Sequence, residues 1–117
     1  MFLRWRQRPL RRQPDSTLEA VLVQSVRVGG QPRQQTVGYL GSIRAQYRLA
    51  PAYRQAFWRS VERRLAVLDL PLATRQALEG QLAQQVPRPT PEELGQVAAQ
   101  QAALRQLLGG LHGQDTA

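Results

Sequence analysis

The sequence contains no cysteine, no lysine and a single histidine, His112, among its 117 residues. Without cysteine the chain cannot form disulfides or thiolate metal sites, and one histidine cannot supply a histidine-rich metal site. No apolar run approaches the roughly 20 residues that span a bilayer. A signal peptide would require an apolar segment of about 7–15 residues after the N-terminal arginines, and the sequence has no such segment there. These absences predict a cytoplasmic protein with no metal, no cofactor and no membrane partner.

The charge of the chain is positive and unevenly distributed. Sixteen arginines stand against 8 acidic residues, for a net charge of +8. Residues 1–70 hold 13 arginines and 4 acidic residues, whereas residues 71–117 hold 3 arginines and 4 acidic residues. Such a one-sided excess favours a polyanionic partner, nucleic acid above all. Two other interpretations stay open: arginine-rich coding in a GC-rich genome, and charge that serves only solubility.

Alternating patterns predict three strands in the first part of the chain. Residues 2–8 alternate with period two, although an unstructured basic arm would also fit them. Residues 18–28 and 32–40 flank Gly29-Gly30, a pair typical of a two-residue hairpin turn in which both residues take positive φ. An unbroken register across this turn predicts four inward side chains in two facing pairs, Leu22 with Val37 and Ala20 with Tyr39.

Helical periodicity predicts a first helix that begins near Pro51. Spacings of three and four residues place one set of apolar side chains on a single face: Tyr53, Phe57, Val61, Leu65 and Leu68. Arg54 and Arg64 fall near this face, so they are expected to extend to solvent or to form ion pairs.

Two further helices are predicted in the second half of the chain. The second covers residues 71–85 and directs Leu72, Leu78 and Leu82 inward. The third begins at a capping box, Thr90-Pro91-Glu92-Glu93, and ends at Gly109-Gly110. We therefore predict an α+β fold: an N-terminal three-stranded antiparallel β-meander followed by three α-helices. Residues 1–45 form a basic sheet module, residues 46–110 a helical region packed on it, and residues 111–117 a disordered tail.

No pattern in the sequence predicts catalysis. A phosphate-binding loop joins a strand to a helix and uses lysine, but Gly29-Gly30 joins two strands and lysine is absent. Glu92 and Glu93 suit the start of a helix, and the remaining acids are expected to pair with arginines. No serine has a histidine close in sequence, so we predict that the protein has no catalytic residues and is not an enzyme.

Arginine, glutamine and one tryptophan make the strand region a candidate nucleic-acid site. A two-stranded ribbon fits the major groove of DNA, and arginine and glutamine suit guanine and adenine edges, which favours DNA over RNA. A plain structural sheet with a polar surface is the alternative. The candidate contact residues are Arg4, Trp5, Arg6, Arg8, Arg11, Arg12, Arg27, Arg33 and Gln34.

The hairpin resembles the N-terminal region of DDE-type insertion-sequence transposases, and also small uncharacterised bacterial proteins that share it. The matching positions are Ser25, Arg27, Gly30, Arg33, Gln34, Val37, Leu40 and Gly41, together with the opening Met1-Phe2-Leu3-Arg4. The likeness covers about residues 1–45. Gln31 and Gln24 depart from the lysine and the acid of that pattern, and no acidic catalytic triad follows. The resemblance implies a DNA-binding module of mobile-element ancestry without transposition chemistry.

Two rival functions follow from the helices. The leucines and glutamines of residues 72–108 would suit a protein-interaction module or a homodimer, and an exposed leucine stripe would favour this. Binding of the first helix to a membrane surface is the other rival. Phe57 and Trp58 lie beside core-like leucines, which argues against it.

Overall fold

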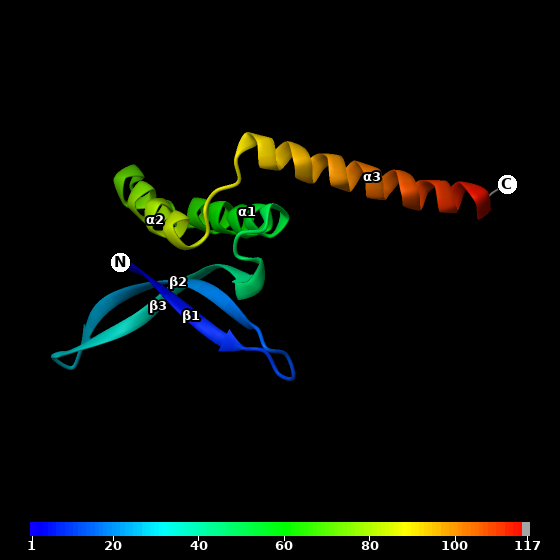
Figure 1. Cartoon of the computed structure of the whole chain (residues 1–117). Helices are drawn as coiled ribbons and strands as arrows, with labels where there is room; N and C mark the ends of the chain where they lie inside the picture. The colour runs from blue at the N-terminus through cyan, green and yellow to red at the C-terminus, as the bar shows by residue number, and fades with distance from the viewer. Residues whose placement is uncertain (116–117) are drawn as a thin grey trace.

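A computed structural model describes residues 1–115 of the chain, and the side chains of residues 1–109. Three antiparallel strands in the order β1-β2-β3 are followed by a short 3-10 helix, Ala45–Tyr47, and three α-helices. The predicted meander and the three helices are confirmed (Figure 1). The element bounds are β1 Phe2–Pro9, β2 Ser16–Val28, β3 Gln31–Arg44, α1 Pro51–Leu68, α2 Leu72–Gln85 and α3 Pro91–Asp115.

The turn between β2 and β3 is the predicted glycine pair. Gly29 and Gly30 have φ angles of 61° and 80°, a conformation that residues with a Cβ atom adopt at a cost. From this turn the register runs without interruption from Val28 opposite Gln31 to Val23 opposite Thr36. The sequence therefore predicts the outer half of the hairpin correctly.

Two β-bulges then shift the inner half of the hairpin. Leu22 lies opposite Gly38, and Ala20 lies opposite Gly41. The strand also continues to Arg44, beyond its predicted end at residue 40. The predicted inner pairing is wrong, because a bulge places two residues of one strand against one of its partner. The pairs that do not form are Leu22 with Val37 and Ala20 with Tyr39.

The residues added by the bulges belong to the core. Val37 and Leu40 are the two residues of β3 without an opposite partner in β2, and both pack into the hydrophobic cluster. Tyr39 lies between them, opposite Val21, and keeps 36% of its surface exposed. The bulges thus bring two extra apolar side chains to the helices and leave Tyr39 out of the core.

The core lies between one face of the sheet and the helices α1 and α2 (Figure 1). Trp58 is 3% exposed, and its indole N–H donates a 2.9 Å hydrogen bond to the carbonyl oxygen of Val86, so its polar atom is satisfied. Phe57 stacks on Trp5 at 6.0 Å between ring centroids and meets Trp58 edge to face. The fully buried members of this cluster include Ala20, Leu22, Leu40, Phe57, Val61, Leu65, Leu82 and Val86.

Two of the helical residues predicted to face inward are exposed instead. Tyr53 is 45% exposed and stacks on Tyr47 with 4.3 Å between ring centroids, and Leu72 is 70% exposed at the start of α2. Arg54 takes an inward position on α1 and is 5% exposed. It forms an ion pair with Glu93, one of the two outcomes expected for it, and donates to the carbonyl oxygens of Pro87 and Arg88.

Helix α3 begins as predicted and ends later than predicted. The backbone N–H of Glu93 donates to the Thr90 hydroxyl, and that of Thr90 donates to the Glu93 carboxylate, each at 3.1 Å. The helix continues through Gly109-Gly110 to Asp115, so the predicted stop is wrong. Glycine weakens a helix by only about 1 kcal/mol and does not by itself end one. Residues 116–117 of the predicted tail lie outside the described residues.

The N-terminal part of α3 contacts α1, and the rest of the helix leads away from the sheet (Figure 1). Val97 is buried against the body, whereas residues 98–109 are all exposed. None of the helices in residues 1–115 is long and apolar enough to cross a membrane.

The close approach of β3 to α1 gives a first prediction. A Cβ atom on Gly41 would lie 3.2 Å from Phe57 Cδ2 and 3.3 Å from the Phe57 carbonyl oxygen. Gly41→Ala should therefore lower the free energy of unfolding by about 1–3 kcal/mol, the usual cost of overpacking. Gly38→Ala is the matched control, because its Cβ meets nothing within 4 Å. Equal urea midpoints for the two variants would contradict the packing of β3 on Phe57.

Candidate nucleic-acid interface

The sheet face that points away from α1 and α2, here called the outer face, carries the arginines of β1. Side chains alternate along a strand, and Leu3 and Trp5 pack into the core. Arg4, Arg6 and Arg8 consequently lie on the outer face, together with the residues of β2 and β3 that pair with them or continue the alternation. The other outer-face residues used below are Val21, Val23, Arg27, Gln34 and Thr36.

Two of these arginines extend across the sheet. Arg4 Nη1 donates to Gln34 Oε1 at 3.3 Å, and Arg6 Nη2 donates to Thr36 Oγ1 at 3.4 Å. Arg4 lies opposite Val21 and Gln34 opposite Ser25, so the Arg4 side chain runs diagonally past the strand between them. Both contacts join β1 to β3 over the middle strand.

The residues beneath these arginines are buried although no helix covers them. Val21 and Val23 are each 2% exposed, yet they point away from the core cluster. The aliphatic parts of long arginine side chains can cover apolar surface while the guanidinium stays in water. We therefore assign the burial of Val21 and Val23 to the arginines that cross above them.

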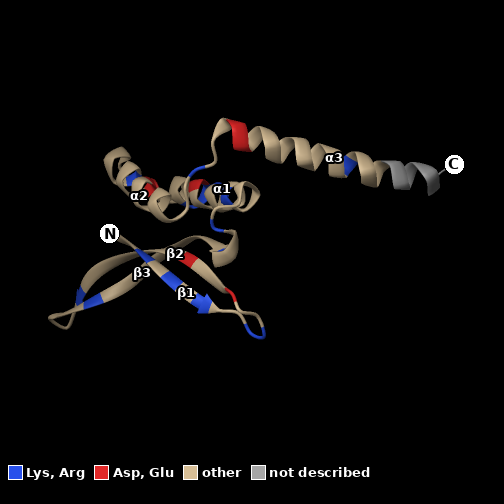
Figure 2. Cartoon of the chain, viewed as in Figure 1, with Lys and Arg blue, Asp and Glu red and all other residues tan. Residues whose placement is uncertain are grey.

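The hairpin continues past β1 as a two-stranded ribbon. The pairing of β1 with β2 begins at Phe2 opposite Val23, so residues 24–28 and 31–35 pair only with each other. Figure 1 shows this end of the hairpin extending beyond the sheet, and Figure 2 shows its positive charge. The ribbon carries Arg27, Arg33 and four glutamines, and it contains no acidic residue. A basic ribbon without acids has the composition expected of a surface that contacts a polyanion.

Acidic partners reach only part of the basic surface. Arg8 pairs with Glu19 and Arg44 with Asp15. Within the described side chains, no ion pair involves Arg27 or Arg33, or the two arginines that cross the outer face. The partners of Arg4 and Arg6 are neutral. Their charges therefore remain available to an anionic ligand.

The structure divides the nine predicted site residues into separate groups. Five share the outer face: Arg4, Arg6, Arg8, Arg27 and Gln34. Arg33 lies at the ribbon but on its opposite face, because its partner is Val26. Arg11 and Arg12 lie in the turn between β1 and β2, far along the sheet from the ribbon, and Arg12 has a φ of 64°.

Trp5 does not belong with the arginines. Its ring stacks on Phe57 on the helical side of the sheet, so it cannot stack on a base beside Arg4 and Arg6. The alternation of β1 already separates Trp5 from its arginine neighbours. The inclusion of Trp5 among the candidate contact residues is therefore corrected, and the alternation of β1 alone could have excluded it.

Sequence reasoning missed Thr36, which accepts the hydrogen bond from Arg6, and it missed the exposure of Tyr39 beside Arg64. An unbroken register buries Tyr39, and only the bulges turn it outward.

Among the described residues no group of three histidine, cysteine or acidic side chains is placed to hold a metal ion. Comparison of the chain with protein-family models, curated proteins and solved structures finds no match.

Proposed function

We propose that the protein binds double-stranded nucleic acid, DNA rather than RNA, through the two-stranded ribbon and the outer face of the sheet. The observation that carries this proposal is the ribbon of residues 24–35, which projects beyond β1 with arginines, glutamines and no acid. Strands in a sheet lie about 4.8 Å apart, and the major groove of B-DNA, about 12 Å wide, admits a ribbon of two strands. The major groove of A-form RNA is too narrow for it.

The two parts of the surface suit different contacts. Arg27 and Gln34 lie on one face of the ribbon, and these residue types hydrogen-bond guanine and adenine edges. Arg4 and Arg6 lie further back on the same face, where they would contact phosphates. Ribbon side chains would then read bases while the arginines of β1 fix the position of the protein on the duplex.

The role that we propose is non-catalytic. The resemblance of the hairpin to the N-terminal region of DDE-type transposases supports a DNA-binding module of mobile-element ancestry that acts in the bacterial cytoplasm, where the DNA lies. Binding of this kind needs no metal or cofactor, because charge and hydrogen bonds supply the affinity.

Fluorescence anisotropy across a salt series tests the proposal. Each neutralised phosphate contributes about −0.9 to the slope of log K against log salt on duplex DNA, so four or five contacts give a slope of roughly −4. The double variant Arg4→Gln, Arg6→Gln removes the two proposed phosphate contacts of β1 and should flatten the slope by about 2. Arg75→Gln with Arg105→Gln removes the same charge from α2 and α3 and should leave the slope unchanged.

Two results would contradict the proposal. One is the absence of binding to duplex DNA at about 50 mM salt and micromolar protein, where nonspecific contacts alone give a signal. The other is an equal loss of slope in both double variants, which would show that only net charge matters. Stronger binding to double-stranded RNA of the same length would replace DNA by RNA as the target.

The exposed part of α3 favours a second function, homodimerisation. Leu104, Leu107 and Leu108 are 57%, 65% and 48% exposed, and Arg105 is the one charged residue between 98 and 109. A helix segment this short is marginal in water unless an apolar face packs against a partner. A second copy of this chain fits as the partner, because residues 98–109 contain no acid and offer no charge pattern that selects a different partner. Dimers with two-fold symmetry also suit duplex DNA.

Sedimentation equilibrium between about 1 and 100 μM protein measures this dimer, a range in which micromolar association is visible. The mass should approach twice that of the chain, and Leu104→Glu with Leu107→Glu should return it to the monomer. Ala102→Glu with Gln106→Glu is the control of equal charge, because these two residues lie on the opposite face of the same helix. A monomeric wild type over the whole range would remove the dimer and leave the DNA proposal intact.

A further inference from the structure

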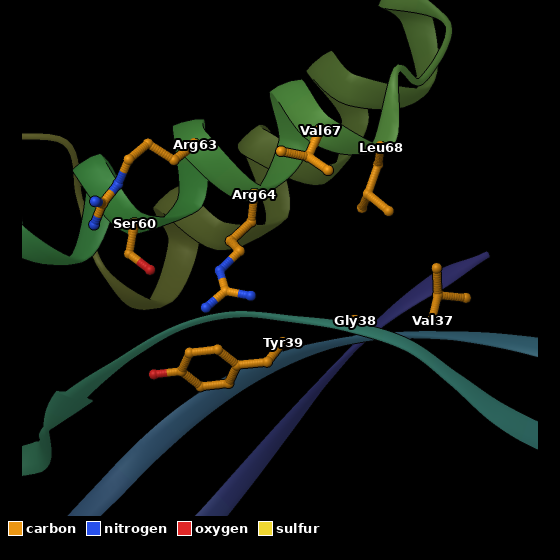
Figure 3. Close-up of a pocket in the computed structure, with 8 residues that line it drawn as sticks. All are labelled: Val37, Gly38, Tyr39, Ser60, Arg63, Arg64, Val67 and Leu68. Atoms are coloured by element: carbon orange, nitrogen blue, oxygen red, sulfur yellow. The ribbon is translucent and has the colours of Figure 1, made fainter.

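A groove between β3 and α1 has not been used by the proposed function. Its volume is about 430 Å³, within the range of about 300–1,000 Å³ typical of small-molecule sites. Figure 3 shows its two ends: Arg64 reaches toward the Tyr39 ring at one, and Val37, Val67 and Leu68 lie together at the other. The groove is therefore polar and cationic at one end and apolar at the other.

The cationic end lacks an internal counter-charge. No acidic residue lines the groove, and within the described side chains neither Arg63 nor Arg64 forms an ion pair. The Arg64 guanidinium carbon lies 5.7 Å from the centroid of the Tyr39 ring. An unpaired Arg64 guanidinium beside a partly exposed ring, in a groove that Arg63 also lines, suits a ligand that combines a phosphate with an aromatic base.

The apolar end is open to solvent. Val67 is 84% exposed, and a Cβ on Gly38 would meet no atom within 4 Å. A flat apolar group can therefore enter between β3 and α1 without displacing protein atoms. An added β-strand fits less well, because the bulges at Val37 and Leu40 break the regular edge that strand pairing requires.

The groove lies on the path from the ribbon. Tyr39 follows Gln35, the last ribbon residue of β3, by four residues, which is about 13 Å of strand. Successive bases along one DNA strand are about 3.4 Å apart, so the same length corresponds to about four nucleotides. A strand that leaves a duplex held at the ribbon can reach the groove within a few nucleotides.

We propose that this groove binds one unpaired nucleotide of a single-stranded extension, with its phosphate at Arg63 and Arg64 and its base against Tyr39 and the apolar end. This inference rests on the proposed duplex binding at the ribbon and adds a preference for duplexes that end in a single-stranded overhang. Stacking of one base on an aromatic side chain contributes roughly 5- to 100-fold to affinity.

The experiment compares a blunt duplex with the same duplex carrying a short single-stranded overhang, by anisotropy at one ionic strength. Wild type should bind the overhang duplex about tenfold more tightly. Gly38→Leu places a side chain in the groove and should abolish this preference while the blunt duplex binds as before. Gly95→Leu, also at a glycine whose Cβ meets nothing, lies on α3 and should retain the preference.

Equal wild-type affinity for the two duplexes would overturn the inference while leaving duplex binding in place, as would a preference that survives Gly38→Leu. Failure to bind the blunt duplex would instead overturn the proposed function.

Calorimetry with a free nucleoside monophosphate separates the two sources of nucleotide, a single-stranded overhang and a free mononucleotide. If the free nucleotide binds the groove of wild type while the overhang adds no affinity, the groove is a mononucleotide site and the inference is overturned. A glutamate-rich peptide that binds wild type but not Gly38→Leu would assign the groove to an acidic peptide and overturn the inference.

Discussion

Phe57→Ala should lower the free energy of unfolding by about 3–5 kcal/mol, the range measured for buried aromatic residues replaced by alanine. Phe57 is 1% exposed and lies in the hydrophobic core between the sheet and α1. Its ring lies against Trp5 of β1 and Trp58 of α1, and its edge touches the position of the Gly41 Cβ in β3. A cavity at this position cannot close by the movement of one side chain, because three different segments surround it.

The stability of small domains is about 5–15 kcal/mol, so this one substitution removes a large part of it. Urea unfolding followed by tryptophan fluorescence measures the change, since Trp5 and Trp58 both contact Phe57. Tyr53→Ala is the control on the same helix: Tyr53 is 45% exposed and loses mainly its stacking on Tyr47, about 0.5–1.5 kcal/mol. A Phe57 variant no less stable than the Tyr53 variant would show that α1 does not pack on the sheet as described.

Glu93→Gln should destabilise the protein far more than Glu92→Gln, the same change one residue earlier. Glu93 closes the capping box with Thr90 and pairs with Arg54, which is buried in α1. Loss of its charge leaves a buried guanidinium with neutral partners only, such as the carbonyl oxygens of Pro87 and Arg88. Glu92 lies in the same exposed first turn and has no such contacts among the described side chains.

This destabilisation should depend on pH. The hydrogen bond from the Thr90 backbone N–H lowers the pKa of Glu93 below its ordinary value of 4.5, and Arg54 lowers it further, while partial desolvation opposes both. A carboxyl group with a lowered pKa in the folded state stabilises the protein above its unfolded pKa. That stabilisation is lost as the pH falls through the folded pKa. The gap between wild type and Glu93→Gln should therefore be full at neutral pH and shrink below about pH 4.5.

Urea midpoints of both glutamine variants at neutral pH and in a series of acidic buffers measure this effect. A gap that stays constant into acid would show that Glu93 acts through side-chain shape and not through its charge. Equal midpoints for the two variants at neutral pH would contradict the contact of Glu93 with Arg54.

The local features of this fold follow from the sequence because single residues determine them. Gly29-Gly30 identifies the hairpin turn, and Thr90-Pro91-Glu92-Glu93 identifies the start of α3. These signals depend on backbone geometry and on hydrogen bonds between near neighbours. Features that depend on packing between distant segments are predicted less well. The bulges have no local signature. Helical spacing places Arg54 near the apolar face, but it does not reveal the buried site that α1 and α3 together create for this residue.

The candidate interface shows the same contrast between local features, which the sequence predicts, and features that depend on packing between distant segments. Alternation along β1 places its arginines on one face, but it cannot predict that Arg4 and Arg6 cross to β3. The exposure of Tyr39 depends on two added residues whose position the pattern of β3 does not reveal. Leu72 shows the opposite error: helical spacing predicts burial, but no segment covers that face at the start of α2.

The arginines over Val21 and Val23 have a thermodynamic consequence for any ligand. If Arg4 and Arg6 turn toward phosphates, water reaches the two valines, and hydration of apolar surface raises the heat capacity. Binding would then carry a positive heat-capacity contribution from the valines, opposite in sign to the usual negative change on association. If the arginines bind phosphates without leaving the valines, this contribution is absent. Calorimetric titrations at several temperatures therefore report whether these side chains move.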